Sequence, residues 1–487
     1  MNNEIRNLAP TELWNKFADL NAVPRPSKKE ERVIAFIKDF GEKLGFETRV
    51  DMVGNVIIKK PATQGMENRK PVILQAHLDM VHQKNSDTQF DFDNSGIEMY
   101  IDGDWVRAKG TTLGADNGLG VASIMAVLES KTIEHPALEA LFTIDEETGM
   151  TGAKGLEPGL LNGEILLNLD TEEDDEIGIG CAGGVDITAT GDYQEEDTPE
   201  GSAAYLIKIE GLQGGHSGMD IIKGLGNANK LMNRILFRSS EELDIRISSI
   251  NGGGLRNAIP RESEAVVVID DMQVNALQEV FEDEKEIILA EFSRLEPKLN
   301  ISLIKTEIPE SVIETGDQDI LLRAVYGTHN GVFRMSPDIN GLVETSNNIA
   351  RVEVKEGVIN IYCLTRSSVD SSKQDLANSI SAVFELAGYE VKLSGSYPGW
   401  TPNPESDILK VMDELYQNMN NKKAHIAACH AGLECGIIGQ NYPEVDMISF
   451  GPTIRGAHSP DERASISSAQ KYWKFFLEVL KNIPEKA

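Results

Sequence analysis

Histidines and carboxylates follow four short apolar segments that lie far apart in the sequence. The residues concerned are His77 and Asp79 after PVILQA, Glu146 and Glu147 after ALFTID, Asp170 after EILLNL, and His458 in the loop after VDMISF. A further carboxylate, Asp116, opens a predicted helix after the loop KGTTLGA. Two imidazoles with several carboxylates suit zinc, with cobalt or manganese as lesser candidates. The residue types therefore predict a metal site.

These residues can form one site only if the segments before them are strands that end at a common edge. The apolar segments have the length and composition of buried strands and span 71–76, 137–144, 164–169 and 445–450. Helical periodicity is found at 11–23, 29–45, 116–130, 406–419 and 466–483. This alternation predicts an α/β fold with a mostly parallel sheet covered by helices. Ligand crevices of such sheets lie outside the carboxyl ends of the strands, which is where we expect the candidate ligands.

The spacing within two of these motifs suggests separate roles for neighbouring carboxylates. Residues i and i+2 of a strand share a face, so Asp79 can hold the imidazole of His77 while that imidazole ligates a metal. Glu146 and Glu147 are adjacent, and adjacent residues of an extended chain point in different directions. One of them can therefore bind a metal while the other faces an attacking water molecule.

The alternating pattern of predicted strands and helices changes near residue 186 and resumes near residue 400. The stretch 191–203 is acidic and rich in turn-forming residues, as linkers are. Strands and helices then follow in two similar series, one up to residue 296 and one over 300–395. We predict a catalytic domain split into 1–185 and 400–487, with an α+β lid domain inserted over 186–399. The repeated order favours two ferredoxin-like halves within the insert.

The overall charge and the cysteines argue against several classes of protein. The 46 basic and 78 acidic residues give a formal net charge of −32, whereas nucleic acids and anionic membranes attract basic surfaces. No apolar run approaches the ~18 residues of a membrane helix, and the first residues lack the pattern of a signal peptide. Four scattered cysteines form no disulfide framework, which fits a reducing compartment. We expect a soluble cytoplasmic protein.

Taken together, the motifs resemble those of the co-catalytic zinc peptidases. This family includes carnosinases, peptidase T, glutamate carboxypeptidases and acetylornithine deacetylases. The matching stretches are LQAHLDMV, KGTTLGADNGLGVA, FTIDEETGMTGA, LLNLDTEE, IGCAGG, GLQGGHSGMDI, GGGLRNAIPRES, CHAGLECG and GPTIRGAHSPDER. They extend over nearly the whole chain, and their combination and order are specific. Within the family they are most similar to the bacterial aminoacyl-histidine dipeptidases, also called cytosol non-specific dipeptidases.

The resemblance implies a particular arrangement of the metal ligands. Asp116 would bridge two metal ions, and zinc is the ion that the resemblance implies. His77 and Asp170 would complete one metal site, and Glu147 and His458 would complete the other. The peptide bond that follows Asp116 would be cis.

The resemblance also implies how a peptide bond is cut. Glu146 would be the general base for a water molecule that bridges the metals, and Asp79 would orient the neighbouring imidazole ligand. The inserted domain would act as a lid, from which His216 in the motif GGHSG stabilises the oxyanion. Asn257 and Arg366 are candidates for binding the substrate's main chain and its free carboxylate.

Several alternatives stay open on the sequence alone. A tripeptidase, a carboxypeptidase or an N-deacylase of the same family is the main rival to a dipeptidase. A non-catalytic peptide-binding relative is a remote one, because the base and all five ligands are present. Relatives often form homodimers through the lid, but a doubled lid can supply the same groups within one chain. The roles of His430 and Glu434, in CHAGLECG, are not defined by the sequence. No candidate ligands accompany four other histidines, which we expect at the surface: His82, His135, His329 and His425.

Overall fold

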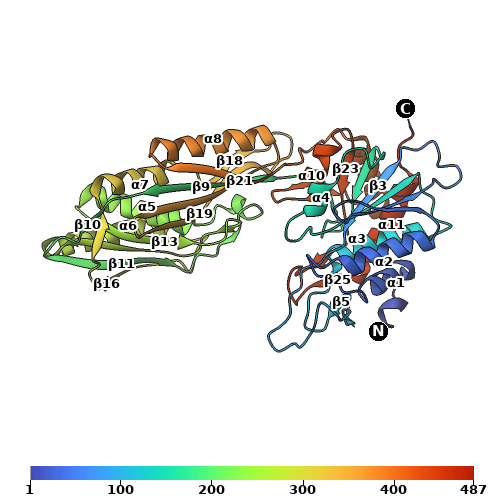
Figure 1. Cartoon of the computed structure of the whole chain (residues 1–487), viewed down its shortest axis with the longest axis horizontal. Helices are drawn as coiled ribbons and strands as arrows, with labels where there is room; N and C mark the ends of the chain where they lie inside the picture. Colours follow the sequence, from blue (N-terminus) through green and yellow to red (C-terminus); the bar gives the residue numbers. More distant parts are fainter. Residues whose placement is uncertain (1, 487) are drawn as a thin grey trace. The chain divides into compact units, whose positions relative to one another are not determined.

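The computed structural model describes residues 2–486, which form two compact units. The first unit contains residues up to 180 together with 400–428 and 433 onward, and the second contains 181–399 and 429–432. Figure 1 shows the first unit in blue, teal and red and the second mainly in green, yellow and orange. Each unit is described by itself below.

The first unit is built on a sheet of eight strands in the order β1-β2-β6-β3-β7-β23-β8-β22. Its four central strands are parallel and comprise β6 (Leu138–Thr143), β3 (Val72–His77), β7 (Ile165–Asn168) and β23 (Asp446–Ser449). The flanking strands are β1 (Glu47–Val50), β2 (Val56–Lys60), β8 (Glu176–Cys181) and β22 (His425–Cys429). β1, β2 and β8 pair antiparallel with their inner neighbours, so antiparallel strands flank the parallel centre of the sheet on both sides.

Helices and a second small sheet complete the first unit. The helices are α1 (Thr11–Leu20), α2 (Glu31–Lys43), α3 (Ala115–Glu129), α4 (Thr151–Gly155), α9 (Asp407–Asn420), α10 (Glu434–Asn441) and α11 (Ile466–Lys481). The small sheet, which the sequence did not reveal, comprises β4 (Met99–Asp102), β5 (Trp105–Ala108), β24 (Ile454–Arg455) and β25 (Arg463–Ser465). Its hairpin between β24 and β25 carries His458, so this sheet positions a candidate ligand.

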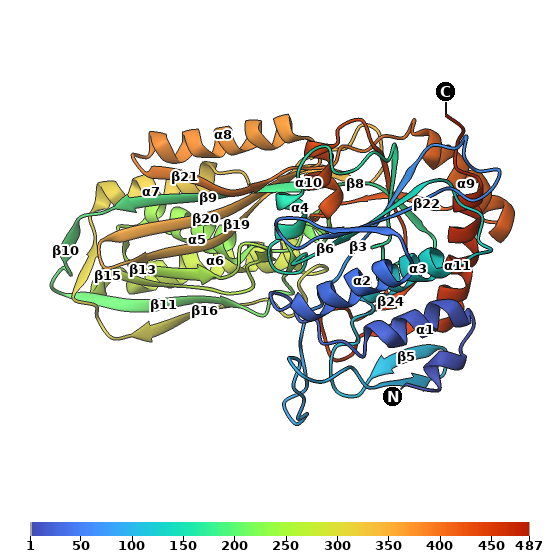
Figure 2. The same cartoon turned by 45° about the vertical axis from the view of Figure 1, so that its right-hand side comes forward.

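The second unit contains a sheet of nine strands, and its helices pack on this sheet around one apolar core. The strands are β9 (Gly183–Asp192), β11 (Ser202–Glu210), β13 (Arg246–Gly253), β15 (Ser263–Asp270), β16 (Asn300–Thr306), β18 (Gly331–Met335), β19 (Val343–Lys355), β20 (Val358–Ser367) and β21 (Glu390–Tyr397). The long helices are α5 (Ala228–Glu242), α6 (Val274–Phe292), α7 (Thr315–Gly327) and α8 (Asp370–Leu386). Figure 2 shows the strands side by side, with α5 and α6 behind them.

Two halves with the same element order make up this larger sheet. One half runs β11-α5-β13-β15-α6-β16 and the other β9-α7-β19-β20-α8-β21, and in both the strands lie in the order fourth, first, third, second. The first half is nested within the second, between β9 and α7. The segment 300–306 is therefore the last strand of the first half, whereas the sequence pattern predicted it as the first strand of the second half. Sequence order cannot reveal this, because β16 pairs with β11, almost 100 residues earlier.

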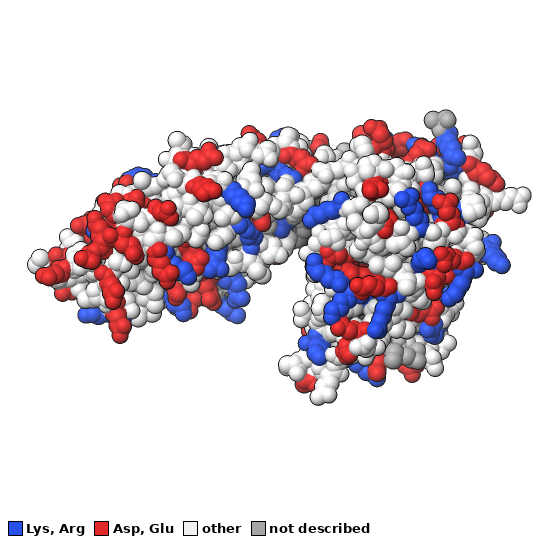
Figure 3. Space-filling model, viewed as in Figure 1, with Lys and Arg blue, Asp and Glu red and all other residues white. Residues whose placement is uncertain are grey.

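Charged side chains are distributed over both units. Figure 3 shows acidic side chains gathered at the end of the second unit, where β10 (Glu195–Asp197) lies. On the face shown, basic side chains are interspersed with acidic ones. Over residues 2–486, none of the helices has the length and apolar character needed to cross a membrane.

The junction between the two halves of the second unit makes a stability prediction possible. Gly253 pairs with Arg351 across the junction, has a φ of +77°, and a Cβ there would lie 1.9 Å from the main-chain oxygen of Ala350. Gly253→Ala should therefore lower the free energy of unfolding by about 2 kcal/mol or more, measured by urea denaturation. Gly254→Ala is the matched control, because no atom lies within 4 Å of its added Cβ. Equal effects of the two substitutions would contradict the packing described here.

Candidate metal centre and active site

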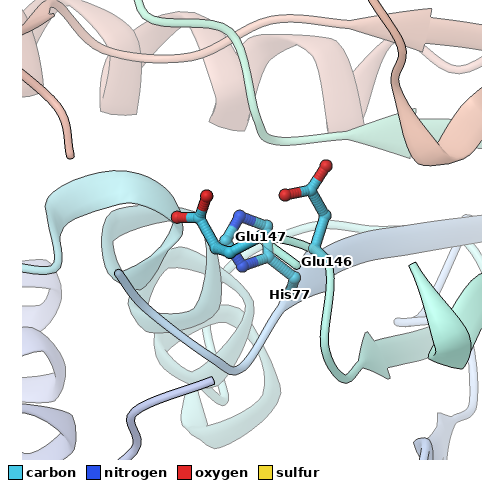
Figure 4. A group of neighbouring side chains, drawn as sticks. All are labelled: His77, Glu146 and Glu147. Atoms are coloured by element: carbon cyan, nitrogen blue, oxygen red, sulfur yellow. The ribbon is translucent and has the colours of Figure 1, made fainter. Parts of the chain in front are cut away.

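Three parallel strands deliver donor groups to one edge of the central sheet. β3 ends at His77 and β7 ends two residues before Asp170, while Glu146 and Glu147 follow the end of β6. The two glutamates lie in a turn and not in extended chain as the sequence suggested. Figure 4 shows their carboxylates diverging, with the imidazole of His77 between them in that view. The turn therefore gives the two adjacent carboxylates different surroundings.

The carboxylate of Asp116 lies between two imidazoles from opposite ends of the chain. Its Oδ1 is 3.2 Å from Nε2 of His77, and its Oδ2 is 3.2 Å from Nε2 of His458. On one side, Nε2 of His77 is also 3.5 Å from Oδ1 of Asp170. On the other, Nε2 of His458 is 3.0 Å from Oε2 of Glu147. The five predicted ligands thus form two groups of three that share Asp116, each compact enough to hold a metal ion.

The main chain around Asp116 is held by a carboxylate from the loop that carries His458. Oε1 and Oε2 of Glu462 accept hydrogen bonds from the main-chain N–H groups of residues 113–116, at 2.7 to 3.3 Å. The peptide bond between Asp116 and Asn117 is cis, as the family resemblance implied. Arg25 supports the same segment, donating to the carbonyl oxygen of Gly114 at 2.6 Å. The loop that carries the candidate ligand His458 therefore fixes the main chain of Asp116.

Asp79 connects the imidazole of His77 to the turn that carries the two glutamates. Its Oδ1 is 3.4 Å from Nδ1 of His77 and accepts a hydrogen bond from the N–H of Glu146. Its Oδ2 accepts from the N–H of Glu147 and from Oγ of Ser27. Burial would raise the pKa of Asp79, but the hydrogen bonds and the charge of His77 outweigh it and lower this pKa. Asp79 is therefore an ionised acceptor that orients several parts of the site.

The concentration of carboxylates shifts the protonation of the whole site. Hydrogen bonds to Asp116 and Glu147 raise the pKa of His458 to about 11. Burial raises the pKa of Asp170 to about 6, against the opposing charge of His77. Burial also raises the pKa of Glu146 well above its usual range. The site therefore attracts positive charge and contains one carboxyl group, on Glu146, that has a strong affinity for a proton.

The donor set fits divalent metal ions. Two imidazole nitrogens and three carboxylates are the donors that zinc and related ions take from proteins. Oε1 of Glu147 is buried and has no hydrogen-bond partner among the described residues, as expected of an oxygen that can ligate a cation. His77 has Asp79 on its other ring nitrogen, the usual arrangement of a ligating histidine.

A second group of polar side chains surrounds His216 in the second unit. Nδ1 of His216 accepts hydrogen bonds from the N–H groups of Gly218 and Met219, at 3.2 and 3.1 Å. The ring proton must therefore be on Nε2 when the imidazole is neutral. Burial and then the charge of Arg366 lower the pKa of His216, which favours that neutral form. His216 is thus set up as a hydrogen-bond donor through Nε2.

Arg366 and Asn257 lie close to this histidine. Arg366 donates from Nη1 to the hydroxyl of Tyr397 at 2.8 Å, and its Nη2 is 3.5 Å from Nε2 of His216. The strand β14 (Ala258–Ile259) pairs with β12 (Gly215–His216), which places Asn257 beside the histidine motif. The Asn257 side chain is exposed. The sequence-predicted residues of the insert thus come together in one cluster of donors.

His430 belongs to the same cluster, which the sequence did not establish. Its Nε2 lies 2.7 Å from Oγ of Ser346, and its main-chain oxygen packs against Gly218. Burial, followed by the charges of Arg366 and His216, lowers the pKa of His430 to about 3. His430 is therefore a neutral, buried member of this group.

Several residues that support the site were missed from the sequence, and one histidine was misplaced. Glu462 lies within a quoted motif but received no role, and Arg25 and Ser27 lie before the first predicted strand with no motif to mark them. The position of Glu462, four residues after a candidate ligand, is the one signal that was available. His135, expected at the surface, is buried and bonds the carbonyl oxygen of Pro136 at 2.7 Å.

Comparisons with known proteins find similarity to peptidases. The family model described as peptidase family M20/M25/M40 matches residues 73–482. The chain is 45% identical over 483 residues to the cytosol non-specific dipeptidase of Escherichia coli (strain K12), and the match covers 99% of this chain and 100% of that one.

Solved structures show the same likeness. The crystal structure of the aminoacylhistidine dipeptidase from Vibrio alginolyticus matches with a TM-score of 0.94 at 45% identity, covering 99% of each chain. The aminopeptidase PepT from Bacillus cereus matches with a TM-score of 0.57 at 14% identity, covering 98% of this chain and 99% of that one. At that identity the second likeness shows a shared fold alone.

Removing the Glu462 carboxylate should weaken the site although every candidate ligand side chain is kept. Glu462→Ala leaves the four main-chain N–H groups without their acceptor. It should lower the free energy of unfolding by about 3 kcal/mol and the metal affinity about 10- to 100-fold. Urea denaturation and competition with a chelator measure the two effects. Asp461→Ala is the control, because its exposed carboxylate only pairs with Arg107. An unchanged metal affinity in Glu462→Ala would show that the Glu462 carboxylate does not position Asp116.

Proposed function

Because the chain belongs to peptidase family M20/M25/M40, we propose that it is a metal-dependent dipeptidase of broad specificity that includes aminoacyl-histidine substrates. The observation that carries the proposal is the carboxylate of Asp116 placed between His77 and His458. The two relatives at 45% identity, one named a cytosol non-specific dipeptidase and the other an aminoacylhistidine dipeptidase, support dipeptides as substrates. A cytoplasmic location rests on the name of the first relative.

Two divalent ions, zinc first and cobalt or manganese as alternatives, are the proposed cofactors. His77 and Asp170 would hold one ion, Glu147 and His458 the other, and Asp116 would ligate both. When bound, such ions supply Lewis acidity, which polarises a peptide carbonyl and makes a water molecule more acidic.

Glu146 is the proposed general base. Its raised pKa, caused mainly by burial, gives its carboxylate a high affinity for the proton of an attacking water. The same carboxyl group can then return that proton to the leaving amine. Asp79 accepts a hydrogen bond from the main-chain N–H of Glu146 at 3.0 Å, and its Oδ1 lies 3.4 Å from Nδ1 of His77. Asp79 therefore orients the base and a ligand together.

The second unit is proposed to act as a lid that supplies groups for the substrate. The Nε2–H of His216 can stabilise the oxyanion, since a fixed donor needs no reorganisation during the reaction. Arg366 suits the free carboxylate of a dipeptide, because a guanidinium can donate two parallel hydrogen bonds to it. Asn257 is proposed to bind the substrate's main chain. Whether these groups act within one chain or across a homodimer is left to sizing by light scattering.

A substrate panel tests the proposed function. Dipeptides, tripeptides, longer peptides and N-acylated amino acids are offered to the protein loaded with zinc, manganese or cobalt, and free amino acids are quantified. We expect dipeptides, including those with a C-terminal His, to be cut fastest. Glu146→Gln should retain the metals but lower kcat at least about 100-fold, which excludes a contaminating peptidase. Faster release from tripeptides or acylated amino acids would favour those rival activities, and no release would favour a binding protein.

The assignment of Arg366 predicts a dependence on the substrate's carboxylate. Arg366→Ala should raise KM for a dipeptide about 10- to 100-fold, the value of a lost charge-assisted hydrogen bond. The same dipeptide with an amidated C-terminus should show almost no further change. Tyr397→Phe is the control, since it removes one partner of Arg366 and keeps the guanidinium. Equal losses with both substrates would mean that Arg366 does not bind the carboxylate.

A further inference from the structure

A layer of buried polar side chains lies beneath the candidate metal centre. Each of the four parallel strands contributes one fully buried residue: Gln75 from β3, Thr143 from β6, Asn168 from β7 and Ser449 from β23. Gln75 and Asn168 lie two residues before His77 and Asp170, on the same face of their strands. Two residues before each polar residue, an apolar residue of the same strand packs against α10. The polar layer thus separates the apolar core from the metal-binding residues.

The side chains of this layer form a hydrogen-bond chain that runs in one direction. Oγ of Ser449 donates to Oδ1 of Asn168 at 2.5 Å, and Nδ2 of Asn168 donates to Oε1 of Gln75 at 2.5 Å. Nε2 of Gln75 then donates to Oε2 of Glu434 at 2.7 Å. Oγ1 of Thr143 donates to the same oxygen at 2.6 Å. Glu434 is therefore the terminal acceptor of the whole chain.

Glu434 is the first residue of α10 and is completely buried. Burial raises its pKa to about 8, against the opposing charge of His77 and with the negative charge of Asp170 adding to it. Oε2 accepts both hydrogen bonds, so a proton held by this carboxyl group would be on Oε1, which has no partner among the described residues. The chain therefore needs an acceptor oxygen at this position, which a neutral side chain with a carbonyl oxygen can also supply.

We propose that Glu434 is a positioning residue for the metal centre, which orients the Gln75 amide and so fixes the strand ends that carry His77 and Asp170. The proposal rests on the proposed function, because it concerns the same metal ligands. Glu434 touches neither ligand in the described contacts and acts through Gln75 and Thr143.

The physical reason is the ambiguity of a buried amide. Gln75 can be turned so that its oxygen and nitrogen exchange places, which would set its NH₂ group against that of Asn168. The acceptor on Glu434 excludes that orientation. Gln75 and Asn168 are directly paired on neighbouring strands, so the bond between their side chains ties β3 to β7 just below the ligands. A half-satisfied buried network is unstable and would loosen this connection.

Two substitutions of Glu434 separate the acceptor from the volume of the side chain. Glu434→Met keeps the length of the side chain and removes the acceptor. Glu434→Gln keeps an acceptor oxygen and places an NH₂ group where the carboxyl proton would be. Ile438→Ala is the structural control, since Ile438 is buried on the same helix and belongs to the apolar cluster below the polar layer.

We expect Glu434→Met to lose metal affinity about 10- to 100-fold, measured by chelator competition, and to lose kcat for a dipeptide by a similar factor. KM should change less than about twofold, because the substrate-binding groups assigned above lie in other segments. Hydrogen exchange in the metal-free protein should become faster in the peptides covering 72–79 and 165–171. Glu434→Gln should restore most of the metal affinity and of kcat. Ile438→Ala should lower Tm and leave both quantities near those of the unmodified protein.

The proposal is overturned if Glu434→Met keeps normal metal affinity and normal exchange, or if Glu434→Gln is as damaged as Glu434→Met. It is also overturned if Ile438→Ala reproduces the loss of metal affinity, since that loss would then follow general destabilisation. Metal affinity and hydrogen exchange do not depend on the substrate. A failure of the dipeptidase proposal would therefore leave these two measurements able to support or overturn the role of Glu434.

Discussion

The two oxygens of one carboxylate, that of Asp116, face the imidazoles of His77 and His458, which are far apart in the sequence, and much of the first unit supports this arrangement. His77 ends a central strand, whereas His458 lies in a hairpin of the small second sheet. Glu462, in that same hairpin, binds the main chain on the N-terminal side of Asp116. The hairpin thus supplies a candidate ligand and also holds Asp116, the residue shared by both groups of candidate ligands. The small sheet is therefore part of the site and not a peripheral addition.

The layering of the central sheet explains how such a polar site rests on an apolar core. Along β3, Ile73 packs in the core, Gln75 belongs to the polar layer and His77 lies against the carboxylate of Asp116. At the end of β7, Asn168 likewise belongs to the polar layer and Asp170 to the candidate ligands. Side chains two residues apart share a face, so a strand passes from core to site on one face. The side chains of the polar layer hydrogen-bond one another and Glu434, which lowers the cost of burying them.

The sequence was sufficient where chemistry and strand periodicity coincide. His77 and Asp170 could be located because each follows a short apolar strand, and parallel strands place their ends at one edge. It was insufficient where long-range pairing decides the outcome. The nesting of the two halves depends on which partner β16 finds, and no local pattern encodes that choice. Glu434 was noticed without a role and Glu462 was overlooked for a related reason, because an acceptor for N–H groups is recognised only after those groups are in place.

The density of carboxylates makes positive charge the remaining requirement of this site. Asp79, Asp116, Glu147 and Asp170 surround two imidazoles, and Glu146 is close by. Mutual repulsion and burial disfavour so many negative charges in one place, and the pKa values of Asp170 and Glu146 are raised, with burial as the largest cause. Two divalent cations would relieve this repulsion, whereas a neutral ligand would not. Beneath the site, burial likewise raises the pKa of the Glu434 carboxyl group, so a proton is held there more readily than on an exposed glutamate.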